Sequence, residues 1–188
     1  MSNVTVADRF KGARIIALLT IIAGVVLIVA GGITWGAVAS QLKAENIEVS
    51  AVTPENPGSL AGKSVQDPFT AFAQANAINH HALAGTDGKT YAELGALITA
   101  KKAELSAAGK SDADVAKDVD VLKLQGQRTT IMNGSFLRAS LFTSVVAFGI
   151  AALVIGLGIL FILVGYALRV FAVKPETVVA PVAVSPQV

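Results

Sequence analysis

The chain has 188 residues, a formal net charge of +2 and no cysteine. Hydrophobic residues make up 53% of the sequence and charged residues only 15%, whereas soluble domains are about 25% charged. The small net charge gives no argument for nucleic-acid binding, and the absence of cysteine excludes disulfides, iron–sulfur clusters and thiolate zinc sites. The length is enough for one modest domain in addition to membrane spans.

Two apolar runs, one toward each end of the chain, account for the low share of charge. Residues 15–42 contain no charged side chain and follow Arg14, and residues 139–168 lie uncharged between Arg138 and Arg169. A bilayer core of about 30 Å needs roughly 20 helical residues, so both runs predict transmembrane helices. A buried helix of a soluble protein is the alternative, but two such runs would need a much larger protein to cover them.

A cleaved signal peptide is a second alternative for the first run. Small residues at 37–39 resemble a cleavage site, and basic residues precede the run. The apolar region of a signal peptide is about 7–15 residues long, which is far shorter than residues 15–42. We therefore expect an uncleaved span.

The charges that flank the two runs predict the orientation. Residues 1–14 contain three basic residues and one acid, and residues 169–188 contain two basic residues and one acid. Because short basic flanks stay in the cytoplasm, we expect both termini there and residues 43–138 outside the cell membrane. The tail after Lys174 is rich in valine, proline and alanine, and we expect it to be disordered.

Small residues recur at seven-residue intervals in both runs. Helices in lipid associate through close packing, and a spacing of seven returns to nearly the same helix face. The candidate packing rows are Ala23, Ala30 and Ala37, then Ala17, Gly24 and Gly31, and in the second run Ser144, Ala151, Gly158 and Gly165. Gly32 and Gly36 form a GxxxG pair that could serve another helix. The partner of these rows is the other span, a second copy or another protein.

The segment between the runs predicts a small, mostly helical domain with a possible short β-hairpin at 46–66. Polar and apolar residues alternate over 46–52, and residues 60–66 could return as a second strand. The expected fold class is therefore mainly α: a membrane protein with an antiparallel two-helix transmembrane hairpin and a small extracytoplasmic domain.

Helix-start and helix-stop signals divide the rest of that segment. Asp67-Pro68 predicts a helix with Phe69 and Phe72 on its apolar face. Thr90 to Glu93 is a capping box, and a second one begins at Ser111. From there the chain either bends at Asn133-Gly134 or continues as a helix into the second run.

Chemically reactive side chains show no convergent pattern. His80 and His81 are adjacent, and neighbouring helical residues point about 100° apart, so the pair cannot converge on one metal as an i, i+4 pair can. Asp87 or Glu93, after the turn, could complete a His/carboxylate metal site with them. Neither apolar run contains Asp, Glu, Lys, Arg or His, which argues against ion or proton transport. We expect no cofactor and no enzymatic activity.

Several stretches resemble a family of small actinobacterial two-span membrane proteins, whose members are often labelled aromatic ring-opening dioxygenases. The stretches that resemble the family are residues 67–75, 78–83, 88–94 and 132–142, and residues 95–127 look like an insertion. Extradiol ring cleavage needs iron held by a convergent set of histidines and a carboxylate, and His80 and His81 alone cannot supply that set. The resemblance therefore implies a bacterial cell membrane and a role for the Asn-His-His and Phe-Leu-Arg segments, and no activity.

The leading hypothesis is a non-enzymatic accessory or structural subunit of a respiratory or cell-envelope complex, or a self-associating membrane scaffold. Its partners would be membrane lipids and other membrane subunits or copies of itself, with no nucleic acid. The alternative is an extracytoplasmic ligand- or metal-binding module, anchored by two helices, that acts as a sensor. The sequence favours the first hypothesis because it shows no cluster of reactive or metal-binding side chains and because both runs are rich in small residues that allow helices to pack.

Overall fold

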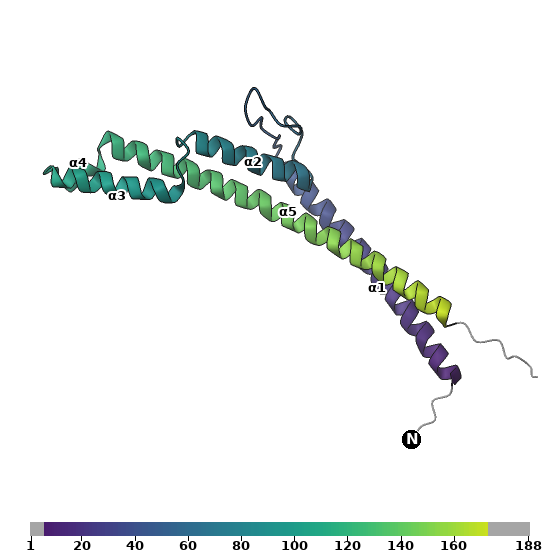
Figure 1. Ribbon diagram of the computed structural model, residues 1–188. Helices are drawn as coiled ribbons and strands as arrows, with labels where there is room; N and C mark the ends of the chain where they lie inside the picture. Colours follow the sequence, from purple (N-terminus) through teal and green to yellow (C-terminus); the bar gives the residue numbers. More distant parts are fainter. Residues whose placement is uncertain (1–5, 173–188) are drawn as a thin grey trace, which may run out of the picture. The chain divides into compact units, whose positions relative to one another are not determined.

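The computed structural model describes residues 6–172, with side chains from Lys11 onward, and it is mainly helical. The helices in this range are α1 (Val6–Ala44), α2 (Pro68–Ala84), α3 (Tyr91–Ala107), α4 (Asp112–Ala116) and α5 (Val119–Phe171) (Figure 1). Helices α1 and α5 are long and apolar enough to cross a membrane, and both extend beyond the predicted runs. The tail after Lys174, expected to be disordered, lies outside the described residues.

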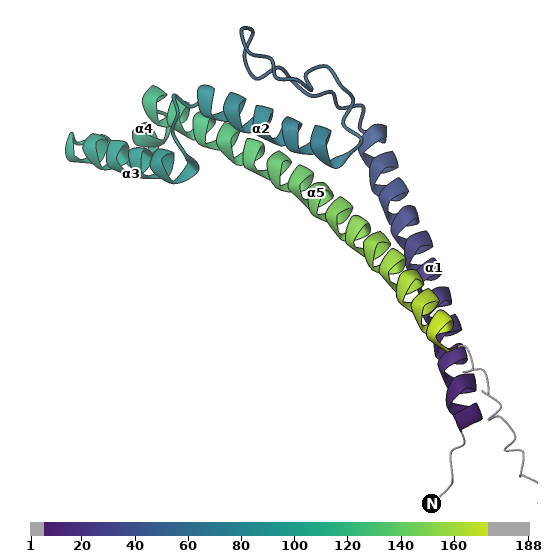
Figure 2. The same ribbon diagram turned by 45° about the vertical axis from the view of Figure 1, so that its right-hand side comes forward.

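Two compact units make up the described chain. One consists of the residues up to Gly31 and from Leu153 onward, and the other of Gly32–Ala152. We call the first the helix-pair unit and the second the larger unit. Each contains a part of α1 and a part of α5 (Figure 2).

In the helix-pair unit, α1 and α5 touch through their backbones. A Cβ atom on Gly24 would lie 2.5 Å from the carbonyl oxygen of Gly158, and one on Gly158 would lie 2.6 Å from the carbonyl oxygen of Gly24. Seven residues further along α5, a Cβ atom on Gly165 would lie 2.7 Å from the carbonyl oxygen of Ala17. Only residues without a side chain allow this approach, which is the close packing that helices in lipid require.

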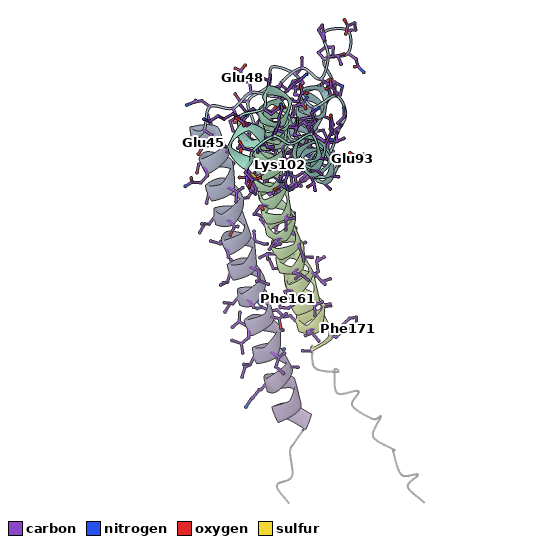
Figure 3. All side chains as sticks on the ribbon, turned by 90° about the vertical axis from the view of Figure 1, so that its left-hand side faces the viewer. Glu45, Glu48, Glu93, Lys102, Phe161 and Phe171 are labelled. Carbon is purple, nitrogen blue, oxygen red and sulfur yellow. The ribbon has the colours of Figure 1, made fainter. Side chains whose placement is uncertain are left out.

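Large apolar side chains of the helix-pair unit point away from this contact. Ile15 is 60% exposed and Leu163 is 59% exposed, whereas Ala17 is fully buried. Figure 3 shows side chains of carbon alone along most of these two helical segments, with Phe171 directed outward at the end of α5. The arrangement is the reverse of a water-soluble protein, in which large apolar residues are the ones most often buried.

The larger unit contains an apolar cluster. It brings together side chains from the end of α1, the loop after α1, helix α2 and residues 141–148 of α5. Trp35 of α1 packs on Phe148 of α5 with ring centroids 4.8 Å apart, and Phe148 is fully buried. Ala71 and Ala75 present the buried face of α2 to the same cluster. Val49 and Val65 add the loop to it.

The predicted β-hairpin at 46–66 is wrong. Within the described residues this segment contains one isolated antiparallel bridge, between Glu48 and Ser64, and no strand. Backbone hydrogen bonds join Val49 to Lys63 and Gly62 and join Val65 to Ile47, but they form a single bridge and no ladder. The chain turns at Gly58 and Gly62, with φ of +88° and +74°, and prolines at 54 and 57 remove donors that a longer ladder would use.

Helix α2 begins at the predicted cap but buries a different face from the one expected. The Asp67 carboxylate accepts from the backbone N–H of Phe69 and Thr70, and Thr70 completes a capping box. Phe69 is 76% exposed and Phe72 is 49% exposed, so the expectation for these two residues is wrong, whereas Ala77, on the same predicted face, is fully buried. The buried face of α2 consists mainly of alanines, and Phe72 reaches α5 only from its edge, where its ring lies 5.7 Å from that of Phe142.

Gly134 of α5 lies where α2 comes close to α5, and it stands inside a continuous helix. A Cβ atom at Gly134 would lie 2.8 Å from the Cβ of Ala82 on α2. The Asn133-Gly134 pair therefore causes no break in the helix, and α5 continues through it from Val119. The glycine provides space for a neighbouring helix instead of bending its own.

Helix α3 packs on the first part of α5. The predicted capping box between Thr90 and Glu93 is confirmed, and hydrogen bonds from Thr90 lower the pKa of the Glu93 carboxyl. Leu94 is buried with Ile131 of α5, and the Arg128 guanidinium lies 4.0 Å above the Tyr91 ring centroid. These apolar and cation–π contacts attach α3 to the first part of α5.

A short break separates α4 from α5. At the start of α5, Val119 and Leu122 are exposed, and Val121 is buried with Leu105 and Val115. Asp118 stabilises the break by pairing with Lys110 at 3.0 Å, and this hydrogen bond lowers the pKa of the Asp118 carboxyl. The break sets the register in which Val121 reaches the core.

We expect Gly24→Ala to destabilise the helix pair by about 1–3 kcal/mol, the usual cost of overpacking, because the new methyl group would collide with the Gly158 carbonyl. Thermal unfolding in detergent, followed by circular dichroism, measures the loss. Gly156→Ala is the matched control, since a Cβ atom at Gly156 meets nothing within 4 Å. Equal unfolding temperatures for the two variants would contradict the backbone contact.

Candidate functional site

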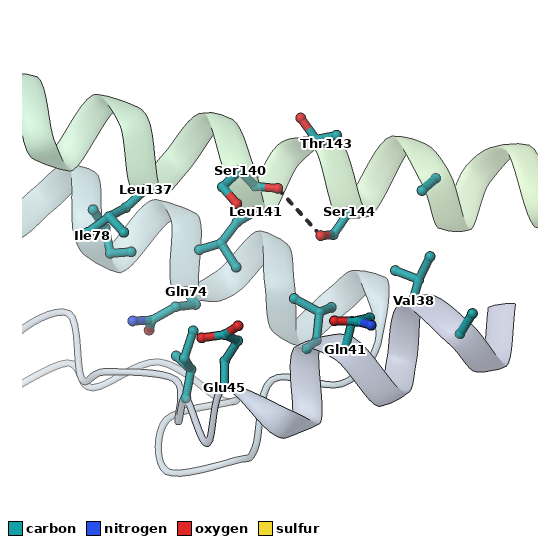
Figure 4. A pocket seen from close by; sticks show the side chains of 14 residues that line it. Val38, Gln41, Glu45, Gln74, Ile78, Leu137, Ser140, Leu141, Thr143 and Ser144 are labelled. Atoms are coloured by element: carbon teal, nitrogen blue, oxygen red, sulfur yellow. Dashed lines mark hydrogen bonds between the residues drawn. The ribbon is translucent and has the colours of Figure 1, made fainter. Parts of the chain in front are cut away.

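A cavity of the larger unit lies where α1, α2 and α5 meet (Figure 4). We call it the junction cavity. Its volume is about 820 Å³, within the range of about 300–1,000 Å³ for small-molecule sites. Its lining residues are Ala37, Val38, Gln41, Leu42, Glu45, Ile47, Gln74, Ile78, Leu137, Ser140, Leu141, Thr143, Ser144 and Ala147.

Small side chains on α1 and α5 create the open space. Ala37 lines the cavity from α1, and Ser140, Ser144 and Ala147 line it from α5. Thr143 and Ser144 hydrogen-bond to the carbonyl oxygens of their own helix, at 2.9 and 3.4 Å, which leaves their surroundings largely apolar. Short side chains therefore leave a volume that leucines at the same positions would fill.

Gln74 is the one buried polar side chain of the lining and is 6% exposed. Its Oε1 accepts from the backbone N–H of Ser50 at 2.7 Å, and its Nε2 donates to the Ser50 hydroxyl at 3.3 Å. The amide thus holds the loop after α1 against α2. One Nε2 hydrogen and one lone pair of Oε1 have no partner among the described residues.

Glu45 is the only charged residue of the lining. It lies at the end of α1, one turn beyond Gln41. Within the described residues, neither side chain makes a hydrogen bond or an ion pair. Figure 4 shows Glu45 and Gln74 on the side of the cavity opposite Ser140 and Thr143. The cavity therefore combines apolar walls with an uncompensated negative edge.

The predicted packing residues fall into three groups. Gly24, Gly158 and Gly165 lie in the contact of the helix-pair unit, and Gly31 and Ala151 are also buried. In the row of alanines, Ala23 is half-buried, Ala30 is exposed and Ala37 lines the junction cavity. Gly32 and Gly36 are exposed, with nothing within 4 Å of an added Cβ atom, and Ser144 lines the junction cavity.

His80 and His81 are not brought together with a carboxylate. Their ring centroids are 6.0 Å apart with planes inclined by 73°, and His81 Nε2 lies 3.2 Å from the carbonyl oxygen of Val52. The part of the chain that the structure describes contains no group of three or more His, Cys, Asp or Glu that could hold a metal ion. Nothing in this arrangement resembles the donor set of an iron oxygenase.

Sequence reasoning missed the junction cavity. Its only sequence signal is the recurrence of alanine and serine on α1 and α5, which we interpreted as helix packing. Small residues leave a void when the opposite side chains are also small and the backbones stay apart. That condition depends on which residues face one another, which periodicity alone does not show.

Comparison of the chain with protein-family models, with curated proteins and with solved structures found no match. The resemblance to actinobacterial two-span proteins therefore stays a prediction. The function proposed below rests on the geometry of this chain alone.

Gln74→Leu should loosen the loop after α1, because the Ser50 N–H would lose its acceptor. Leaving a buried donor unpaired costs about 1–3 kcal/mol. Hydrogen exchange of residues 47–52 should become faster. Gln41→Leu makes the same chemical change in the same cavity without removing a hydrogen bond, so it should leave exchange unchanged; faster exchange in both variants would contradict this role of Gln74.

We expect the two histidines to hold no metal. Protein purified without a histidine tag should contain sub-stoichiometric zinc or iron by elemental analysis, and the double variant His80→Ala, His81→Ala should contain the same amount. A stoichiometric metal that disappears in the double variant would show that the pair is a ligand set completed by residues from elsewhere.

Proposed function

We propose that this chain is a non-enzymatic integral membrane protein, anchored by α1 and α5, that serves as an accessory or scaffold subunit of a larger membrane assembly. The observation that supports the anchoring is the inverted packing of the helix-pair unit. Glycine and alanine lie inside the contact, and isoleucine, leucine and valine cover the outside. In water this exposure would be costly, at about 25 cal/mol per Å² of apolar surface, whereas lipid solvates such a surface.

Charges at one end of the helix-pair unit support the proposed orientation. Arg14 of α1 and Arg169 of α5 line the same surface pocket, together with Ile15 and Leu18. Two basic residues at one end are expected for the cytoplasmic side. In this proposal the termini are cytoplasmic and the segment between the spans, with α2, α3 and α4, lies outside.

The internal pairing of α1 with α5 restricts where a partner could bind. Gly24, Gly158 and Gly165 are already in contact within one chain, so they are not available to another helix. Gly32 and Gly36 remain open on α1, while Trp35 between them packs on Phe148 and fixes the orientation of that face. We place the contact with another membrane helix at Gly32 and Gly36, because small residues there allow close approach.

A second candidate function is an extracytoplasmic ligand-binding or sensing module. The junction cavity favours it, since its volume and apolar lining suit a small amphipathic molecule. The two functions are compatible, because Gly32 and Gly36 do not line the cavity.

Gly32→Leu combined with Gly36→Leu should remove the protein's association with other membrane subunits or with itself, since leucine side chains would hold a neighbouring helix away. Extraction from the native membrane in mild detergent, followed by native electrophoresis and mass spectrometry, measures what stays bound. Gly149→Leu is the control, because it is also a glycine in open space but lies on α5. Retention of the same partners by the double variant would refute the proposed contact.

A further inference from the structure

The junction cavity has an unequal distribution of polarity. Its walls are formed mainly by Val38, Leu42, Ile47, Ile78, Leu137 and Leu141. Glu45, Gln41 and Gln74 supply its amide and carboxylate groups. The other polar residues of the lining are Ser140, Thr143 and Ser144 of α5, and the last two hydrogen-bond to carbonyl oxygens of their own helix. A ligand that fits both parts has an aliphatic portion and a head that donates hydrogen bonds, because two amides and a carboxylate offer acceptors.

Charge further defines the head. Glu45 is the one charged residue of the lining, and it has no cationic partner among the described residues. Glu45 is exposed at the rim of the cavity, so a cationic head can pair with it from the solvent side while the rest of the ligand enters the apolar space. The carboxylate repels a phosphate that lacks an accompanying positive group. The cavity therefore selects a head with an ammonium group over a purely anionic one.

The position of the lining residues agrees with a ligand from the bilayer. Lining residues 37–45 lie at and just after the end of the first apolar run, and lining residues 137–147 lie at the start of the second run. Leu137 and Ala147 are ten residues apart on one helix, about 15 Å at 1.5 Å per residue. An amphiphile with its head at Glu45 and its chain directed toward Ala147 would have its polar and apolar parts at the depths they occupy in a membrane.

We propose that the junction cavity binds a membrane phospholipid with an ammonium headgroup, of the phosphatidylethanolamine type, with one acyl chain inside the cavity. The proposal rests on the membrane anchoring proposed above. Glu45 accepts from the ammonium group, the free Nε2 hydrogen of Gln74 donates to an ester or phosphate oxygen, and Leu137 and Leu141 contact the chain. Ala37 and Ala147 are the positions whose small size makes room for it.

Two variants that fill the cavity test the acyl-chain site. The full chain, purified in mild detergent, is incubated with phosphatidylethanolamine and analysed by native mass spectrometry. Ala147→Phe should lower lipid retention by about tenfold or more, and Ala37→Phe should do the same from the opposite helix. Ala152→Phe is the control, since Ala152 is exposed on α5 and outside the lining. Circular dichroism must show the wild-type helix content in each variant that is scored.

Exchange of the headgroup tests the role of Glu45. Wild-type protein should retain phosphatidylethanolamine about tenfold better than phosphatidylglycerol with the same acyl chains. Glu45→Gln should abolish this preference, and Glu48→Gln, an exposed acid outside the lining, should keep it. Equal retention of both lipids by the wild type would overturn the headgroup assignment.

The outcomes separate this proposal from the proposed function. Retention by folded Ala147→Phe and Ala37→Phe equal to that of Ala152→Phe would overturn the cavity as a lipid site, while the association lost in Gly32→Leu, Gly36→Leu would still support the scaffold. Recovery of the wild-type chain in the soluble fraction of fractionated cells would overturn both. Lipid loss in the filled variants with an unchanged set of protein partners would support the two roles independently.

Discussion

Contact between the backbones of α1 and α5 is the constraint on which the helix-pair unit depends. Lipid offers no hydrophobic reason for two apolar helices to associate, so their attraction comes from close packing. At Gly24 and Gly158 each glycine faces the carbonyl oxygen of the other, at a distance that leaves no room for a methyl group. The seven-residue spacing to Gly165 repeats the contact along the pair, and the large side chains are left to face outward.

In the larger unit, the same two helices are held together by large aromatic side chains instead of by glycine backbones. There Trp35 and Phe148 fill the space between α1 and α5 with two aromatic rings, and α2 approaches α5 through Ala82 and Gly134. Where neither large side chains nor backbone contact occupy the space, the junction cavity results. Small residues thus have three outcomes in one chain: contact at Gly24, close approach of a third helix at Gly134, and a void beside Ala147.

The proposed functions use different surfaces of this arrangement. The outward face at Gly32 and Gly36 is available to another helix, while the cavity with Glu45 at its edge suits an amphiphile from the surrounding bilayer. His80 and His81 form a less complete site, since His81 contacts a backbone carbonyl oxygen and no group of three or more possible metal ligands occurs within residues 6–172. Packing and shape, not reactive groups, are the features from which a role for this chain can be argued.

The sequence by itself determined the helices that local signals specify. Two uncharged runs predicted α1 and α5, and the caps at Asp67 and Thr90 predicted the starts of α2 and α3, because these features depend on near neighbours in the chain. It did not determine which face each helix buries. Phe69 was expected in the core and is exposed, and the alternating residues at 46–52 form one bridge and no strand. Only the tertiary structure decided these points, because burial, strand pairing and the junction cavity depend on residues brought together from distant parts of the chain.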